Sequence, residues 1–281
     1  MNYRHAFHAG NFADVHKHAV LGRVLTHLRL KPAAFRVIDT HAGAGRYDLS
    51  GPKPSHSGEW RQGIARVWEV LRPGEPGALL APYLDVVSAL NPAGTLAVYP
   101  GSPLIVQNLL RPQDRLIACE FEPTAAAALA QALCGDRRIK ALAIDGWTAL
   151  GAYVPPKERR GLVLIDPPFE EAADFGRLSG ALATAYRKWP TGIYMLWYPI
   201  KERDAPDALA RRLQRLAVPK LLRSELILGQ PHVEGGLAGS GLVVVNPPFT
   251  LEAELRRLMP ALGAALSPQA RHRLDWLARE R

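Results

Sequence analysis

Apolar runs closed by an acidic residue recur along the chain and predict buried strands. Phe35–Asp39, Arg115–Glu120, Ile139–Asp145 and Gly161–Asp166 each have this form. Apolar runs without polar alternation are typical of strands covered by helices on both faces of a parallel sheet. Three later apolar runs predict further strands, giving about seven in total: Ile193–Tyr198, Leu221–Leu228 and Gly241–Val245.

Segments with helical spacing of apolar residues lie between these runs. The first, Asp14–Leu30, is expected to be an amphipathic helix capped by Asn11 or Asp14. Further helices are expected at Ser102–Leu110, Thr124–Leu133, Phe175–Trp189 and Leu251–Leu266. The alternation of strands and helices predicts an α/β fold with a Rossmann-like sheet.

The spacing between Gly45 and Glu120 predicts an inserted subdomain. An acid that holds a nucleotide ribose normally follows the glycine loop by about 20 residues, whereas Glu120 follows Gly45 by 75. Residues 53–99 between them are rich in proline and have helical spacing only around Ile64–Leu71. We therefore expect one domain formed by residues 1–52 and 100–281, with a small helical subdomain at 53–99.

Composition indicates a globular protein. The 281 residues are 48% hydrophobic and 22% charged, and no apolar run reaches the roughly 18 residues of a membrane span. The first residues carry no apolar signal-peptide core, so we expect a cytoplasmic protein. We infer no obligate protein partner and expect a monomer. Cys119 and Cys134 form no metal-ligand cluster, and we expect no metal.

The net charge of +9 and pI of about 9.8 suit a partner that is a polyanion. A solvated basic surface would give the same charge, so composition leaves both readings open. The basic residues fall in scattered clusters, which only folding could gather: Arg137, Arg138 and Lys140; Lys157, Arg159 and Arg160; Arg211, Arg212 and Arg215; Lys220 and Arg223.

The glycine loop after the first expected strand could hold a nucleotide. Asp39, Gly43 and Gly45, with Glu120 on the neighbouring strand, supply close backbone approach and an acceptor for ribose hydroxyls. Position 48 is Asp where a dinucleotide fingerprint has its third glycine, so a nicotinamide cofactor is disfavoured. The loop resembles the turn of class I methyltransferases, although an ordinary glycine turn remains the alternative.

Two further strand ends carry candidate chemistry. Asp145-Gly146 follows the third strand, where the acid could accept from the amino group of a cofactor adenine or could merely end the strand. Asp166-Pro167-Pro168-Phe169 follows the fourth. Asp166 and the Pro167 carbonyl could accept both N–H bonds of an aryl amine, the prolines would stiffen the loop, and Phe169 could stack on a base.

Asn246-Pro247-Pro248-Phe249 is a rival for that role. It follows a late strand that we expect to be antiparallel, far from the cofactor, so we assign it to structure. Six of the nine histidines lie within the first 41 residues, without the spacing of a metal site. His18 and His41 are candidate polar contacts, and Tyr3 and Arg4 are candidates for stacking and phosphate contact; buried or packing roles are the alternative.

Five segments together resemble the bacterial RlmJ family, over nearly the whole chain: Tyr-Arg-His-Ala-Phe-His-Ala-Gly-Asn at 3–11, Asp-Thr-His-Ala-Gly-Ala-Gly-Arg-Tyr at 39–47, Tyr-Pro-Gly-Ser-Pro at 99–103, Leu-Ile-Asp-Pro-Pro-Phe at 164–169 and Leu-Trp-Tyr-Pro at 196–199. That family methylates N6 of an adenine in 23S ribosomal RNA, namely adenine 2030. The resemblance implies a class I methyltransferase fold that uses S-adenosylmethionine.

The resemblance also implies roles for individual residues. The implied S-adenosylmethionine contacts are His18, His41, Ser102, Glu120, Asp145, Gly146 and Asp166, to which the glycine loop adds Gly43. Asp166 is the implied catalytic acceptor, with Pro167 and Phe169 beside it, and Tyr3 lies on the substrate side. A DNA adenine or release-factor glutamine methyltransferase, a nicotinamide-dependent oxidoreductase and a non-catalytic RNA-binding protein are the alternatives.

Overall fold

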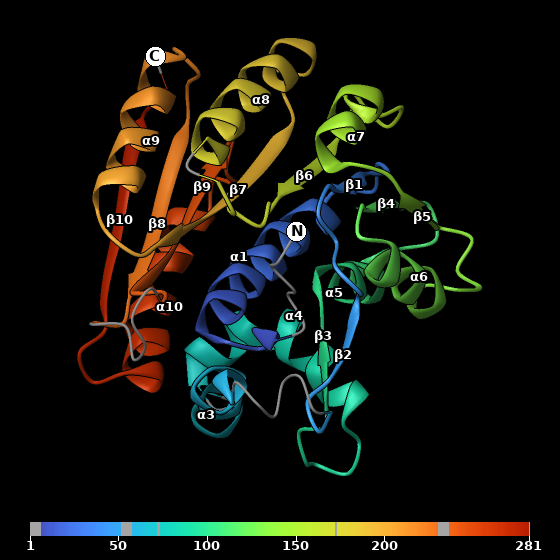
Figure 1. Cartoon of the computed structure of the whole chain (residues 1–281), viewed down its shortest axis with the longest axis vertical. Coiled ribbons are helices and arrows are strands. Elements are labelled where there is room, and N and C mark those ends of the chain that lie inside the picture. Colours follow the sequence, from blue (N-terminus) through green and yellow to red (C-terminus); the bar gives the residue numbers. More distant parts are fainter. Residues whose placement is uncertain (1–6, 52–57, 72–73, 172, 230–235, 281) are drawn as a thin grey trace.

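The computed structural model describes residues 7–51, 58–71, 74–171, 173–229 and 236–280. Its centre is an eight-stranded sheet in the order β10-β8-β9-β7-β6-β1-β4-β5 (Figure 1). The strands of this sheet are β1 (Arg36–Asp39), β4 (Arg115–Glu120), β5 (Ile139–Ala143), β6 (Gly161–Ile165), β7 (Ile193–Ile200), β8 (Leu221–Ile227), β9 (Gly239–Val245) and β10 (Arg271–Ala278). The predicted α/β class is confirmed.

The strand order places a topological switch at the centre of the sheet. Strand β1 pairs in parallel with both β4 and β6, and the chain proceeds from β1 to β4 and β5 on one side before it returns to β6 on the other. Open α/β sheets bind ligands outside the carboxyl ends of strands at such a point. Strand β9 runs antiparallel to β7 and β8, as predicted for the strand before Asn246.

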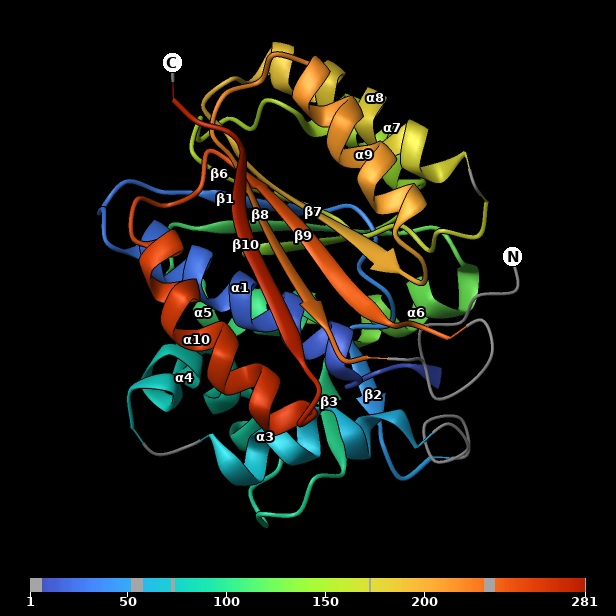
Figure 2. The ribbon, with the colours of Figure 1, turned by 90° about the vertical axis from the view of Figure 1, so that its left-hand side faces the viewer.

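Helices cover both faces of the sheet (Figure 2). One face is covered by α1 (Phe12–Arg29), α5 (Ser102–Leu109), α6 (Pro123–Ala132) and α10 (Leu251–Leu266), and α3 (Ile64–Val70) and α4 (Gly74–Leu90) pack on the outside of α1 and α10. The other face is covered by α7 (Gly146–Tyr153), α8 (Asp174–Lys188) and α9 (Asp204–Arg215). The strands are buried between the two layers, which explains their apolar runs.

Helix α1 is predicted correctly, but it is not amphipathic. Asn11 is its cap and accepts from the backbone N–H groups of Ala13 and Asp14. The helix is buried on nearly every side, and its buried residues include polar ones such as His16. The two ring nitrogens of His16 lie 3.1 and 3.0 Å from the hydroxyls of Ser240 and Ser224. Partners on distant strands therefore satisfy polar positions that the sequence pattern assigns to solvent.

The sequence prediction misses several elements. Strand β10 is partly exposed and charged, so it lacks the apolar run that identifies the other strands. Strands β2 (Arg46–Asp48) and β3 (Val98–Pro100) are short and pair only with each other. Helix α9 is also missing from the prediction. The total is thus eight strands in the main sheet rather than about seven.

The segment expected to form a helical subdomain contains more helix than predicted. It contains the 3₁₀ helix η2 (Glu59–Gln62), α3 and α4. Helix α4 includes Pro82 in its interior, where the sequence suggested an irregular proline-rich segment. Of the helices in the described ranges, none is long and apolar enough to cross a membrane. The division of residues 53–99 from the main domain as a separate subdomain stays a prediction.

Candidate active site

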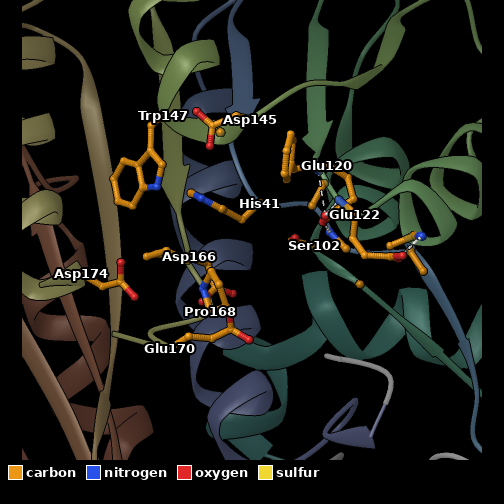
Figure 3. Close-up of a pocket in the computed structure, with 18 of the residues that line it drawn as sticks. His41, Ser102, Glu120, Glu122, Asp145, Trp147, Asp166, Pro168, Glu170 and Asp174 are labelled. Carbon is orange, nitrogen blue, oxygen red and sulfur yellow. Dashed lines mark hydrogen bonds between the residues drawn. The ribbon is translucent and has the colours of Figure 1, made fainter. Parts of the chain in front are cut away.

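A cavity of about 540 Å³ opens at the carboxyl ends of β1, β4 and β6. Pockets of roughly 300–1,000 Å³ suit small molecules and cofactors. All eight residues expected to contact the cofactor line it: His18, His41, Gly43, Ser102, Glu120, Asp145, Gly146 and Asp166. Figure 3 shows side chains from the different strand ends facing this common space. Sequence reasoning therefore selected residues that the fold brings together.

The glycine loop gives the cavity a wall of backbone. Gly43 has φ of +61°, and a Cβ there would lie 2.2 Å from the hydroxyl of Tyr47. Only glycine adopts this conformation readily, and here it also leaves room for the Tyr47 hydroxyl, which accepts from the Ala44 N–H at 3.1 Å. The loop thus presents backbone atoms that a side chain would cover, as close approach of a nucleotide requires.

Glu120 is fixed in place by backbone donors. Its Oε2 accepts from the Gly43 N–H at 2.9 Å, and its Oε1 accepts from the N–H groups of Phe121 and Glu122 at 2.8 Å each. These bonds connect the end of β4 to the glycine loop. The carboxylate therefore holds a defined orientation at the cavity wall.

Asp39 lies behind this wall and is fully buried. Its Oδ2 accepts from the Ser102 hydroxyl at 2.6 Å, while Oδ1 has no hydrogen-bond partner among the described residues. Burial raises the pKa of Asp39 to about 7, although the Ser102 bond opposes this shift. A second buried acceptor is thus available next to the cavity residue Ser102.

Asp145 and Gly146 begin a helix rather than merely end a strand. The Asp145 carboxylate caps α7 by accepting from the Thr148 N–H at 2.9 Å. A Cβ at Gly146 would lie 2.1 Å from the Thr40 carbonyl oxygen, so glycine permits α7 to begin against the β1 loop. His41 sits beside this start, and burial lowers its pKa to about 4. His41 is therefore neutral at pH 7.

Asp166 lies at the end of β6 and is held by a lysine that sequence reasoning missed. The Nζ of Lys17 lies 2.5 Å from Asp166 Oδ2 and 2.9 Å from Asp14 Oδ1. The two carboxylates raise the pKa of Lys17 well above its usual value, against the effect of burial. The signal available in the sequence is the polar triplet His16-Lys17-His18 within an otherwise apolar helix.

His18 contributes to the same side of the cavity. Its Nδ1 lies 2.7 Å from the hydroxyl of Tyr99, and that hydroxyl lies 2.8 Å from the hydroxyl of Tyr83. The His18 ring stacks on Tyr99 with 5.7 Å between ring centroids. This buried chain connects the cavity to α4, within the segment that the sequence identified as inserted.

The segment after Asp166 has an unusual backbone. Pro167 and Pro168 line the cavity, and Phe169 has φ of +50°, a conformation rare for an aromatic residue. The Phe169 ring packs 4.7 Å from Phe175 and 5.8 Å from Trp197, measured between centroids. Tyr3 and Arg4, the other predicted substrate residues, lie outside the described residues.

The second tetrapeptide, Asn246-Pro247-Pro248-Phe249, lies at the ends of the strands opposite the cavity, where the parallel strands begin. Asn246 follows β9, whose last residue Val245 pairs with Tyr194 at the start of β7. The Asn246 side-chain amide donates to the carbonyl oxygens of Pro190 and Gly192, each at 2.8 Å. Asn246 itself has φ of +50°, so the two tetrapeptides differ in conformation as well as location.

Comparisons with known proteins agree with this geometry. A family described as "Ribosomal RNA large subunit methyltransferase D, RlmJ" matches residues 32–278. The ribosomal RNA large subunit methyltransferase J of Escherichia coli (strain K12) is 40% identical over 268 residues, or 95% of each chain. Its counterpart of the same name in Haemophilus influenzae is 38% identical over 270 residues, or 96% of this chain and 95% of its own. The chain belongs to the RlmJ family.

The fold agrees with a solved structure. A crystal structure of a protein from Legionella pneumophila is 34% identical and superposes with a TM-score of 0.89, covering 96% of this chain and 98% of its own. The segment that matches the RlmJ family contains every strand of the main sheet, together with Glu120, Asp145 and Asp166. Lys17 and His18 precede that segment, but the alignments with the two methyltransferases J span 95% and 96% of the chain.

Proposed function

We propose that this RlmJ-family protein transfers a methyl group from S-adenosylmethionine to N6 of an adenine in 23S ribosomal RNA, at the position equivalent to the family target, adenine 2030. The observation that carries the proposal is the placement of Asp166 and Pro167 in the same cavity as Glu120 and Ser102. A target amine and a nucleoside cofactor would meet there. Family membership supports the substrate class.

The residues that line the cavity suit the cofactor. The backbone exposed at Gly43 and Gly146 allows close approach, and a Cβ at either position would collide with Tyr47 or Thr40. The Glu120 carboxylate suits ribose hydroxyls, and Asp145 suits the adenine amino group. We assign the remaining contacts to His18, His41, Ser102 and Asp166. Bound S-adenosylmethionine supplies an electrophilic methyl group on a sulfonium.

The target amine needs two hydrogen-bond acceptors. An adenine amino group is a weak nucleophile because its lone pair is delocalised into the ring. Asp166 and the Pro167 carbonyl would accept its two N–H bonds and turn the nitrogen toward tetrahedral geometry, and Asp166 or water would take the proton. Lys17 holds Asp166 Oδ2, so this carboxylate is oriented before substrate arrives. Preorganised acceptors of this kind contribute much of enzymatic rate enhancement.

Phe169 is the proposed surface for the target base. Stacking on an aromatic ring stabilises a base by about 1–3 kcal/mol, and the packing of Phe169 on Phe175 and Trp197 would hold its ring in one orientation. A strained backbone that the surroundings maintain is a common feature of functional sites. Tyr3 and Arg4 remain proposed substrate contacts.

Transfer of labelled methyl from S-adenosylmethionine to protein-free 23S RNA, followed by nucleoside analysis, tests the proposal. We expect label in N6-methyladenosine at a single site. Asp166→Ala should abolish transfer without unfolding the protein, because Lys17 keeps its pairing with Asp14; Asp166→Asn is the matched variant that keeps the shape. Label found only on DNA or on a release factor would overturn the substrate, and an active Asp166→Ala enzyme would overturn the role of Asp166.

A further inference from the structure

Four exposed arginines lie on helices α8 and α9. We call this the arginine surface; it consists of Arg177 on α8 and Arg211, Arg212 and Arg215 on α9. All four are exposed. Helices α8 and α9 lie side by side in both views (Figures 1 and 2), so Arg177 comes close to the α9 arginines although it is distant from them in the sequence.

Close packing brings the two helices' arginines together. A Cβ at Gly176 would lie 2.7 Å from Arg212 Nη1, so the Arg212 guanidinium lies directly over the glycine that precedes Arg177. Arg211 and Arg215 follow on the same side of α9, one turn apart. Glycine at position 176 therefore allows a guanidinium from α9 to reach α8.

The arginine surface carries unneutralised charge. Arg203, just before α9, pairs with Asp207 and Glu225. By contrast, none of the four arginines forms an ion pair with any carboxylate that the structure describes. Exposed arginines without acidic partners suit a polyanion, because binding then breaks no internal ion pair.

The arginine surface is continuous with the cavity. The Arg177 guanidinium lies over the Trp147 ring at 4.7 Å from its centroid, and the Trp147 ring meets the His41 ring edge-on at 5.2 Å. Arg177, Trp147 and His41 all line the cavity. A chain of contacts therefore runs from the cavity wall to the exposed arginines.

Acidic residues line the cavity next to the start of α8. Glu170, Glu171 and Asp174 line the cavity, and two of them point into it in Figure 3. Negative charge there disfavours a phosphate group inside the cavity, whereas the arginine surface favours a phosphate group outside it. This division suits a substrate whose base enters the cavity while its backbone stays at the surface.

We propose that the arginine surface binds the phosphate backbone of the RNA segment that flanks the target adenine. The inference rests on the proposed function, since it specifies where that function's substrate lies. Helices α8 and α9 thereby position the RNA on the side of the sheet opposite α1. The interaction is through phosphates, so it contributes affinity and register rather than sequence preference.

Gly180 offers a sharp test because it lies on the exposed side of α8, one turn beyond Arg177. A Cβ at this position meets nothing within 4 Å, and glycine is a poor helix former, so substitution should not destabilise the helix. Gly180→Glu should weaken binding of a 23S RNA fragment about tenfold relative to the matched neutral Gly180→Gln, by repelling phosphates. Binding of S-adenosylhomocysteine should be equal in the two variants.

The salt dependence of binding gives a second measurement. The combined variant Arg211→Gln, Arg212→Gln and Arg215→Gln should lower the slope of log affinity against log salt concentration by about 2, since each lost phosphate contact removes about 0.7–0.9. Lys31→Glu is the control for charge reversal. Lys31 is exposed and precedes β1 at the edge of the sheet opposite the cavity, and this variant should bind RNA like the wild type.

The outcomes separate the two proposals. Equal RNA affinity in Gly180→Glu and Gly180→Gln, an unchanged salt slope in the arginine variant, or equal weakening by Lys31→Glu would each overturn the arginine surface while wild-type methylation of RNA stands. A wild-type protein that methylates no RNA would instead overturn the proposed function. A structural defect would lower cofactor binding and thermal stability. Both quantities should be equal in Gly180→Glu and Gly180→Gln, so a difference in RNA affinity between these variants reports on charge.

Discussion

The Nζ of Lys17 lies 2.5 Å from Oδ2 of Asp166, although 149 positions separate the two residues in the chain. Lys17 also pairs with Asp14, and all three side chains are largely buried, with 6%, 2% and 14% of the side-chain surface exposed for Lys17, Asp14 and Asp166. One cation thus serves two carboxylates. The N-terminal helix is thereby connected to the strand end that carries the proposed acceptor.

Removal of this cation should destabilise the fold. Lys17→Met leaves two carboxylates close together without a counter-charge, and loss of one partner from a buried pair costs about 3–5 kcal/mol. Chemical denaturation should therefore show a lower free energy of unfolding. Combining Lys17→Met with Asp14→Asn should restore part of the loss, because one uncompensated carboxylate is then removed. An unfolding midpoint of Lys17→Met at the same denaturant concentration as that of the wild type would contradict this account.

The sequence predicts the cavity well because a simple geometric rule applies. Acids or glycines follow β1, β4, β5 and β6, and the carboxyl ends of parallel strands meet at one edge of the sheet. Gly43, Glu120, Asp145 and Asp166 therefore come together whatever the details of the connecting helices. The prediction of their meeting required only the strand order.

Other features depend on tertiary contacts that no local pattern specifies. Lys17 acquires its role because α1 passes beside the end of β6, and His16 is tolerated in the core because Ser224 and Ser240 meet it. Pro82 reads as a helix breaker, yet packing against α1 keeps it within α4. Local propensity is a weak prior that such contacts override.

Gly146 should be essential for the start of α7. In Gly146→Ala the new methyl group would lie 2.1 Å from the Thr40 carbonyl oxygen, so α7 or the β1 loop must shift. Overpacking of this kind costs about 1–3 kcal/mol, and the shift should also weaken binding of S-adenosylmethionine in calorimetry. Gly151→Ala in the same helix is the control, because its Cβ would meet nothing within 4 Å. Equal cofactor affinity in the two variants would show that Gly146 does not shape the cavity.

His16 should make the protein less stable in mild acid. Burial lowers the pKa of the His16 ring to about 3, from the ordinary histidine value of 6.5 in the unfolded chain. Below pH 6.5 the unfolded chain binds a proton that the folded protein does not, so stability is lost as the pH falls toward 3, by up to about 1.4 kcal/mol per unit. Chemical denaturation of the wild type and of His16→Gln at about pH 7.5 and about pH 5 checks this, because the wild type should lose more free energy of unfolding over that range. Parallel stability curves for the two proteins would exclude His16 as the source.

Asn246 should matter for stability and not for chemistry. Its amide ties the end of β9 to the carbonyls of Pro190 and Gly192, and asparagine tolerates its left-handed backbone better than most residues. Asn246→Ala loses both bonds and adds strain, which should cost about 1–3 kcal/mol. Asn246→Gly keeps the conformation and loses only the bonds, so the difference between the losses of the two variants would measure the strain. Methyl transfer per folded molecule should stay at the wild-type rate in both, because Asn246 lies at the sheet edge opposite Asp166. A folded Asn246→Ala protein without transfer would instead place the second tetrapeptide in the reaction.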